Sequence, residues 1–279
     1  MFAMPIITLS SDIGLQDFIP GAIKGQLFQL IDEARITDIT HLLPPFNYPH
    51  AAYVCRNAIK NFPPGTFHIV MVDFFNEKPE HIILARHNGQ YILCPDNGLL
   101  TMILEELPQE TVGLPLAKES LKNVIYCTQV MGKAIDAVAR GAALQDVGDP
   151  EISIKVKNAL RPLHGPNWME GQILFIDNFE NVVVNIQKDD FQEQRKGRKF
   201  IIEFRRDEVI TRISESYADV AEGEKLASFN AAGYLEIAIN KGNAAGLFGL
   251  QGYSEKLIQS HLQFMSNQLI YQTIKIHFE

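Results

Sequence analysis

Alternation between short apolar runs and helical patterns in the first half of the chain constrains the fold more than any other sequence feature. Residues 5–9 and 67–72 are apolar runs, and the second is rich in β-branched side chains. Residues 23–34 and 51–62 instead repeat apolar side chains at helical spacing. Apolar runs of this length suit the inner strands of a parallel sheet, because helices cover both of its faces. The alternation predicts an α/β domain with a mostly parallel sheet.

Two aspartates follow these apolar runs. Asp12 comes shortly after the first run, and Asp73 comes directly after the second. In open α/β sheets, ligands bind in the crevice outside the carboxyl ends of the strands. Asn97 lies in a third polar loop, residues 95–98, which opens a further helical pattern. We therefore expect a small-molecule site at this edge of the sheet.

The second half of the chain shows the two-residue alternation that is typical of β-strands. Phe200, Ile202 and Phe204 recur at every second position, as do Ile274, Ile276 and Phe278, and residues 178–181 form a tight turn between two apolar runs. Helical periodicity is largely confined to residues 255–267. Short antiparallel strands joined by tight turns predict a small, all-β, barrel-like domain.

A segment without periodicity separates the two patterns. Residues 161–171 contain two prolines and two glycines, which are typical of a domain boundary. We therefore expect an α/β domain over residues 1–160, a linker over residues 161–171 and a smaller β-barrel domain over residues 172–279.

Charge and cysteine content exclude several classes of partner. The formal net charge of −8 repels polyanions and anionic lipid, so we expect no nucleic-acid and no membrane partner. No apolar run reaches the roughly 18 residues of a membrane helix, and the N-terminus lacks the pattern of a signal peptide. The three cysteines lie far apart without a CxxC motif, which favours reduced thiols and a cytoplasmic protein.

The motifs of several common chemistries are absent from the sequence. It contains no GxxxxGKS or GxxxxGKT phosphate loop and no GxSxG elbow, and its eight histidines form no HExxH motif. We therefore expect no metal ion. Asp and Asn side chains instead gather at strand ends and turns, where they can bond a ribose diol, an amine and an adenine edge. The set, which favours a nucleoside-type ligand, comprises Asp12, Asp17, Asp73, Asp96, Asn97, Asp177, Asn181, Asn185 and Asn243.

Segments in both halves of the chain resemble a known family. They include SDIGLQD at residues 11–17, PDNGLL at residues 95–100 and IDNFEN at residues 176–181. Further segments lie at residues 21–25, 38–41, 62–66, 72–73 and 233–245. In order and spacing they resemble the S-adenosylmethionine (SAM) hydrolases, or SAM hydroxide adenosyltransferases, which are relatives of the fluorinases and chlorinases. The resemblance covers nearly the whole chain.

The resemblance implies an N-terminal α/β domain, a C-terminal β-barrel and a homotrimer, with SAM held between the N-domain of one subunit and the C-domain of its neighbour. The implied reaction is attack of water or hydroxide on the 5′ carbon of the adenosyl group, which yields adenosine and methionine. Methionine leaves the sulfonium as a neutral thioether, so no general acid is needed. Catalysis then reduces to aligning and activating a partly desolvated water, with no cofactor beyond SAM itself.

The resemblance also assigns substrate contacts. Asp12 would accept hydrogen bonds from the ribose hydroxyls, and Asp177 would pair with the methionine ammonium. Asn181 would bond the adenine edge, with Phe179 stacking nearby and the Ala244 backbone contacting adenine. The remaining candidate substrate-binding residues are Asp17, Asn97 and Asn243.

The chain departs from this family at the expected water site. The hydrolases use an aspartate, an arginine and a histidine around the attacking water. Asp73 matches the aspartate, but Glu80 stands at the arginine position with His81 beside it, and Tyr126 stands at the histidine position. The candidate catalytic residues are therefore Asp73, Tyr126 and His81.

Three interpretations follow from this departure. The first is a SAM hydrolase with a rebuilt water site, in which Asp73 orients the water and His81, Tyr126 or Glu80 replaces the lost groups. The second is a non-catalytic binder of SAM or adenosine that has lost the arginine–histidine part of the triad. The third is a related enzyme that acts on another adenosyl compound or uses another nucleophile. Retained binding without turnover would distinguish the second from the first.

Overall fold

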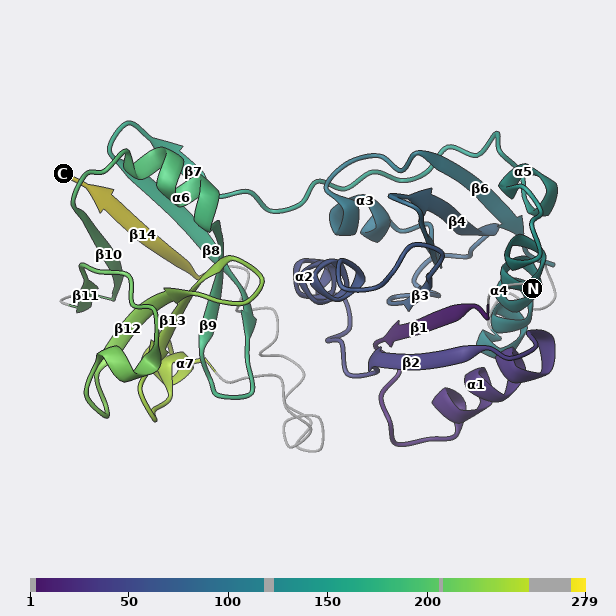
Figure 1. Cartoon of the computed structure of the whole chain (residues 1–279), viewed down its shortest axis with the longest axis horizontal. Helices are drawn as coiled ribbons and strands as arrows, with labels where there is room; N and C mark the ends of the chain where they lie inside the picture. Colours follow the sequence, from purple (N-terminus) through teal and green to yellow (C-terminus); the bar gives the residue numbers. More distant parts are fainter. Residues whose placement is uncertain (1–3, 118–122, 206–207, 251–271) are drawn as a thin grey trace. The chain divides into compact units, whose positions relative to one another are not determined.

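The computed structural model describes residues 4–117, 123–205, 208–250 and 272–279. The chain divides into two compact units, Met1–Ala159 and Leu160–Glu279, which we call unit 1 and unit 2 (Figure 1). The helical pattern at residues 255–267 lies outside the described residues. Within the described ranges, no helix combines the length and apolarity needed to cross a membrane.

Unit 1 alternates strands and helices along the chain, as the hydrophobic pattern predicts. Its elements are β1 (Ile6–Ser11), α1 (Ile19–Leu30), β2 (Arg35–Thr40), α2 (Tyr48–Ile59), β3 (Phe67–Met71), β4 (His81–His87), β5 (Gln90–Pro95), α3 (Leu99–Leu104), β6 (Glu110–Pro115), α4 (Val124–Ala139) and α5 (Leu144–Val147). The six strands form one sheet in the order β2-β1-β3-β5-β4-β6.

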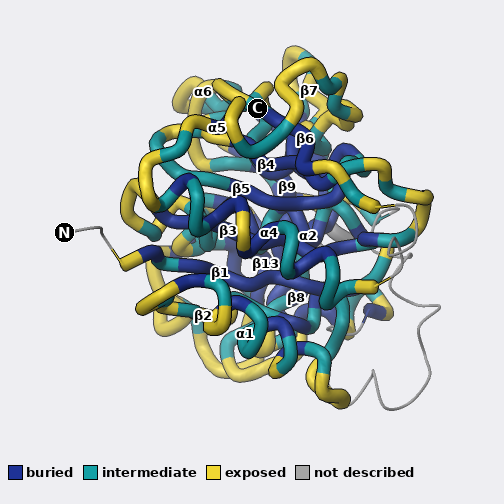
Figure 2. Tube along the Cα trace, turned by 90° about the vertical axis from the view of Figure 1, so that its right-hand side faces the viewer, coloured by how far each residue is buried: buried dark blue, intermediate teal, exposed yellow. Residues whose placement is uncertain are grey.

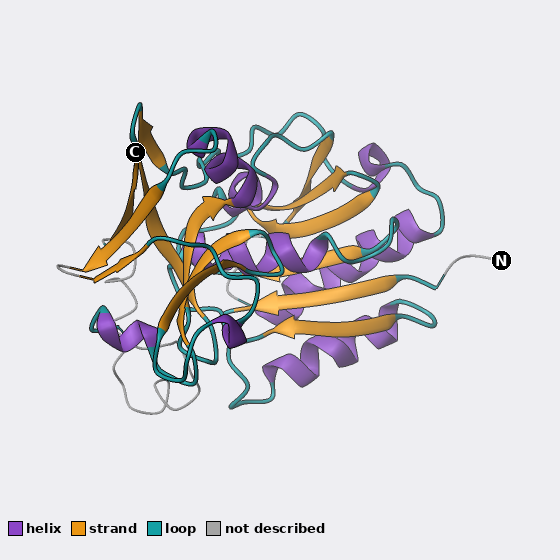
Figure 3. Ribbon diagram, turned by 60° about the vertical axis from the view of Figure 1, so that its left-hand side comes forward, coloured by secondary structure: helices purple, strands orange, loops and turns teal. Residues whose placement is uncertain are grey.

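Helices cover both faces of this sheet (Figure 3). On one face, α1 and α4 bury side chains such as Leu27 and Met131 in a core with β1 and β3. On the other face, α2 and α3 bury Cys55 and Leu100 against side chains that include Val70 of β3. The central strands β1, β3 and β5 are largely buried between the two layers, whereas the edge strand β2 is half exposed (Figure 2). The three layers thus explain why the central strands are continuous apolar runs.

The sheet is mixed, so the expectation of a mostly parallel sheet holds only in part. β1 pairs in parallel with β2 and with β3, and β3 pairs in parallel with β5. β4 is antiparallel to both β5 and β6. The reason is local: Asn88 and Gly89 have φ values of 48° and 75° and return the chain directly as a hairpin. A two-residue turn of this kind can join only antiparallel strands.

The strand order creates a crevice at one edge of the sheet. The chain leaves β1 through α1 on one face, and it reaches β3 through α2 on the other face. After β1 the chain crosses to β2, whereas after β3 it continues to the strands on the opposite side, and such a reversal of strand order places a crevice at the carboxyl ends of β1 and β3. Asp12 follows the end of β1, and Asp73 follows the end of β3. Topology therefore brings these two aspartates together.

Unit 2 is an antiparallel sheet that is nearly closed into a barrel. Its elements are β7 (Leu163–Gly165), β8 (Trp168–Ile176), β9 (Val182–Gln187), α6 (Lys188–Arg195), β10 (Phe200–Arg205), β11 (Glu208–Ile210), β12 (Lys225–Phe229), β13 (Tyr234–Ile239), α7 (Ala244–Leu247) and β14 (Thr273–Phe278). The order is β11-β10-β14-β8-β9-β13-β12, and a bridge between Ile213 and Ala227 joins the two ends of this series. Phe191 of α6 is fully buried in the core.

Strand pairing begins inside the segment that the sequence suggested as a linker. β7 and the first residues of β8 lie within residues 161–171 and pair with each other as a hairpin. Three residues of β7 are too few to display a two-residue alternation, so the prolines and glycines dominate the sequence pattern.

Candidate active site

Asp73 lies at the carboxyl end of β3 and is the centre of a small polar network. The hydroxyl of Tyr48, on α2, donates a hydrogen bond of 2.6 Å to Asp73 Oδ2. The backbone N–H of Asp73 donates to Asp12 Oδ2 at 2.8 Å. Asp73 has a φ of 51°, in the left-handed region that residues other than glycine rarely adopt. Non-glycine residues in this region cluster at functional sites, because the surrounding structure must hold them there.

The carboxyl group of Asp12 faces a partly desolvated environment. Burial raises its pKa, and the nearby charge of Asp73 raises it further, although the hydrogen bond from the Asp73 backbone opposes both. Two carboxylates at one sheet edge repel each other. The site therefore favours a ligand that brings hydrogen-bond donors or positive charge.

Asn97 connects the loop after β5 to the end of β3. Its Nδ2 donates to the carbonyl oxygen of Val72 at 2.9 Å, and its Oδ1 accepts from the backbone N–H of Leu99 at 3.1 Å. These bonds hold the loop against Asp73 and begin α3. Asn97 therefore shapes the site through the backbone.

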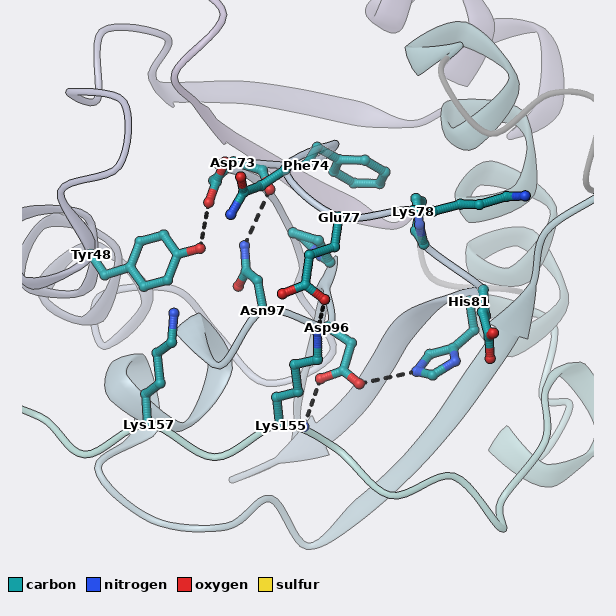
Figure 4. A pocket seen from close by; sticks show the side chains of 14 residues that line it. Tyr48, Asp73, Phe74, Glu77, Lys78, His81, Asp96, Asn97, Lys155 and Lys157 are labelled. Carbon is teal, nitrogen blue, oxygen red and sulfur yellow. Dashed lines mark hydrogen bonds and ion pairs between the residues drawn. The ribbon is translucent and has the colours of Figure 1, made fainter.

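A cavity of about 310 Å³ opens beside Asp73 (Figure 4). Its walls come from the segment after β3, the loop after β5, the start of α2 and the strand-like segment that ends unit 1. The lining residues are Tyr48, Asp73, Phe74, Asn76, Glu77, Lys78, Pro79, Glu80, His81, Pro95, Asp96, Asn97, Lys155 and Lys157. The cavity mixes carboxylates with cations, which suits a polar ligand.

His81 lines the same cavity as Asp73. Its Nε2 lies 3.4 Å from Oδ2 of Asp96, an ion-pair distance. The other oxygen of Asp96 accepts from the backbone N–H of Lys155 at 2.7 Å. His81 therefore lines the cavity with its ring oriented toward Asp96.

Three predicted site residues of unit 1 do not line this cavity: Asp12, which contacts Asp73 directly, and Tyr126 and Asp17. The hydroxyl of Tyr126, on α4, accepts a hydrogen bond of 3.0 Å from the backbone N–H of Ala117. Asp17 is exposed, and its Oδ1 accepts from the backbone N–H of Ile19 at the start of α1. Neither is among the lining residues. Tyr126 thus connects α4 to the segment after β6, and Asp17 accepts from the first residue of α1.

In unit 2, Asp177 organises a tight turn between β8 and β9. Its Oδ1 accepts from the backbone N–H groups of Phe179 and Asn181 at 2.9 and 2.8 Å. Its Oδ2 accepts from Asn181 Nδ2 at 2.9 Å. Glu180 adopts a positive φ of 62° within this turn. The side chain of Phe179 is 76% exposed at the tip and is free to stack on a planar ligand.

Asn181 joins this turn to a buried carboxyl group. Its Nδ2 also donates to the hydroxyl of Tyr217 at 3.2 Å, and that hydroxyl donates to Glu236 Oε1 at 2.5 Å. Burial raises the pKa of Glu236, and the charge of Asp177 adds to this shift. Both hydrogens of Asn181 Nδ2 are therefore used within the protein. The Oδ1 of the same side chain remains as the atom that can accept a hydrogen bond from a ligand.

The remaining two predicted residues of unit 2 lie beside the same turn. Asn243 Oδ1 accepts from the backbone N–H of Gly246 at 2.6 Å and caps α7. Ala244 is fully buried in the core. The backbone N–H of the next residue, Ala245, donates to the carbonyl oxygen of Glu180 at 2.8 Å, which ties α7 to the turn. The predicted residues Asp177, Phe179, Asn181, Asn243 and Ala244 therefore gather in one region of unit 2.

Sequence reasoning missed four residues of these networks. Tyr48 and Lys157 belong to the network at Asp73, and Tyr217 and Glu236 belong to the network at Asn181. Each reaches its partner across the fold, so no local pattern marks it. Within the described ranges, no group of His, Cys, Asp and Glu side chains is arranged to hold a metal ion.

Comparisons with known proteins agree with this arrangement. An (R)-S-adenosyl-L-methionine hydrolase of Methanocaldococcus jannaschii is 30% identical over 67% of this chain and 69% of its own length. A hydrolase of the same name from Salinispora tropica is 27% identical over 90% of this chain and 96% of its own length. A fluorinase of Nocardia brasiliensis is 25% identical over 88% of this chain and 94% of its own length.

A solved structure has the same fold. An uncharacterized conserved protein from Thermotoga maritima superposes with a TM-score of 0.78 and is 26% identical, covering 98% of this chain and all of that one. The N-terminal and C-terminal domain models of the SAM hydroxide adenosyltransferases match residues 7–148 and 171–255. By its two matched domains and its relatives, the chain belongs to the SAM hydroxide adenosyltransferase family.

Proposed function

We propose that this protein is an enzyme that hydrolyses SAM to adenosine and methionine. The observation that carries the proposal is the carboxylate of Asp73, which is held at the switch point of the sheet beside a cavity. Membership of the family and the curated relatives named as SAM hydrolases support this reaction.

In the proposed reaction, Asp73 orients a water molecule toward the 5′ carbon of the adenosyl group. The water oxygen forms the new bond to carbon as the carbon–sulfur bond breaks, and methionine leaves as a neutral thioether. The proton of the attacking water passes to a base, and we assign this role to the Asp73 carboxylate, which lines the cavity. Alignment and partial desolvation of the water supply most of the rate.

The substrate-binding residues are proposed in both units. Asp12 would accept from the ribose hydroxyls in unit 1, where Asn97 shapes the site. In unit 2, Asp177 would attract the ammonium group and Asn181 would accept from adenine at Oδ1. We also propose a homotrimer, which light scattering on the purified protein would test, and a cytoplasmic location.

The first experiment is to incubate the purified full-length protein with SAM and to follow adenosine and methionine by chromatography. We expect stoichiometric release of both products above the buffer blank, and no release from Asp73→Ala. Chelation of metal ions should leave the wild-type rate unchanged. Recovery of bound nucleoside without turnover would instead identify a non-catalytic relative, and a different adenosyl product would identify another nucleophile.

A further inference from the structure

We propose that Tyr48 and Lys157 form a positioning pair that holds and polarises the carboxylate of Asp73. The pair would replace the arginine and histidine that the resembling hydrolases place around the water. This inference rests on the proposed function, and it names the residues that complete the water site in this chain.

The contact between Tyr48 and Asp73 orients the carboxylate. The 2.6 Å hydrogen bond occupies Oδ2. Among the described residues, none donates a hydrogen bond to Oδ1, which leaves that oxygen to accept from water. Burial and the bond to Asp73 raise the pKa of Tyr48 above its ordinary value. The phenol therefore stays protonated and acts as a donor throughout the neutral pH range.

Lys157 brings a positive charge to this pair. Its Nζ lies 3.8 Å from the centroid of the Tyr48 ring, within the range of a cation–π interaction. A cation over a phenol ring withdraws electron density from it and makes the hydroxyl a stronger donor. Figure 4 shows the Lys157 side chain extending toward Tyr48 and the Asp73 end of the cavity. The charge also offsets the repulsion between Asp12 and Asp73.

The placement of Lys157 is determined by its surroundings. Its backbone N–H donates to Thr101 Oγ1 at 2.9 Å, and that hydroxyl donates to the Lys157 carbonyl oxygen at 2.8 Å. The stem of Lys157 packs on Gly98, where an added Cβ would lie 2.6 Å from Lys157 Cγ. Gly98 also has a φ of 88°, so both its conformation and the close approach of Lys157 require glycine.

The other cations of the cavity have different partners. Lys155 Nζ forms an ion pair with Glu77, and His81 faces Asp96 at 3.4 Å. Lys78 extends away from Asp73 in Figure 4. No carboxylate of the described chain lies within ion-pair distance of Lys157. Glu80, at the position of the family arginine, carries the wrong charge to replace it. Lys157 is therefore the cation best placed to act on Asp73.

The test compares Tyr48→Phe and Lys157→Met with two matched controls in the full-length protein. Tyr91→Phe makes the same change on a ring that stacks on Phe67, and Lys133→Met removes an exposed lysine of α4. We expect kcat to fall roughly 10- to 100-fold in each site variant, with KM within about threefold of the wild-type value. Both controls should keep wild-type kinetics.

Two further measurements separate positioning from a structural role. Lys157→Arg should recover part of the lost rate, because it keeps the charge. The double variant Tyr48→Phe with Lys157→Met should lose less than the product of the two single losses, since both residues act through one hydrogen bond. Thermal unfolding of Tyr48→Phe should match that of the wild type, because the ring is retained.

The outcomes distinguish this proposal from the proposed function. If Asp73→Ala abolishes turnover while both site variants keep the wild-type kcat, the positioning pair is overturned and the hydrolase stands. The pair is also overturned if the loss of kcat in the double variant equals the product of the two single losses. It is overturned as well if the variants lose kcat only in proportion to a loss of thermal stability. If the wild-type protein releases no adenosine, the proposed function fails and the pair fails with it.

Discussion

Asp73 in unit 1 and Asp177 in unit 2 have similar sequence contexts and different structural roles. Both follow an apolar strand, and both belong to networks that include a tyrosine hydroxyl. Asp177 accepts three hydrogen bonds from its own turn. The Asp73 side chain accepts one, from Tyr48 on a different element. The turn therefore fixes the Asp177 carboxylate through both oxygens, whereas the Asp73 carboxylate is held through one oxygen by a distant residue.

The two tyrosines show the same contrast. Tyr48 donates to a carboxylate that lines a cavity, so its effect reaches the candidate water. Tyr217 donates to Glu236, which is 5% exposed, and accepts from Asn181. The second network therefore fixes the orientation of the Asn181 side-chain amide, as directional hydrogen bonding to a ligand would require. The network of unit 1 thus leads to one carboxylate that lines a cavity, and the network of unit 2 fixes the orientation of one amide.

The largest expected effect separates the two aspartates directly. Asp73→Asn should lower kcat by about 100-fold or more, because the amide cannot take up a proton from water. Asp177→Asn should instead raise KM and destabilise the fold by about 1–3 kcal/mol, because its amide group would face Asn181 Nδ2. Steady-state kinetics and thermal unfolding of both variants measure this difference. A loss of kcat at constant KM in Asp177→Asn would contradict it.

Buried titratable groups sharpen the comparison between the units. Burial lowers the pKa of His50 to about 3 and that of His68 to about 4, both in unit 1. The unfolded chain takes up these protons near pH 6.5, and the folded chain does not. The free energy of unfolding of unit 1 should therefore decrease by up to about 1.4 kcal/mol per histidine for each pH unit below 6.5.

Hydrogen exchange at the amides of β1 and β3 would measure this loss between pH 6.5 and pH 4. Trp168, the single tryptophan, lies on β8 and reports on unit 2 by fluorescence. No described histidine of unit 2 is buried, so the unfolding of unit 2 should depend less on pH in this range. His164→Gln, at an exposed position, is the control. Equal acid sensitivity of the two units would show that the buried histidines do not account for it.

The smallest expected effect concerns Glu236. Its raised folded pKa means that its contribution to stability is present below the unfolded pKa of about 4.5 and is lost as pH rises through the folded value. Glu236→Gln keeps an acceptor for Tyr217 and removes the buried charge. We expect a gain of about 1 kcal/mol in urea unfolding at pH 7 and no gain below pH 4. A loss of stability at pH 7 would mean that the ionised carboxylate contributes favourably.

Local chemistry made several features predictable. The hairpin of β4 and β5 follows from Asn88 and Gly89, which accept positive φ values within two residues. The aspartates at the ends of β1 and β3 follow from apolar runs and from the rule that ligands bind at such ends. The turn at Asp177 follows from short-range hydrogen bonds of an Asp side chain. In each case the interacting groups are close in sequence.

Other assignments depended on contacts across the fold. Alignment with the family places Tyr126 at the histidine position, yet its hydroxyl bonds the Ala117 backbone. Asp17 is predicted as a ligand residue, yet it is exposed and bonds the backbone N–H of Ile19. β7 has only three residues, which is too short to display a two-residue alternation, so its pairing with β8 is not evident from the pattern.

The sequence by itself determined the two kinds of fold, the strand-end aspartates and the family, because periodicity and short motifs encode them locally. Only the tertiary structure decided which of those aspartates faces a cavity and which side chains reach it. Tyr48, Asp73 and Lys157 come from three separate segments of unit 1. Their contacts exist only when α2, β3 and the end of the unit are packed together, and no spacing along the chain can express that.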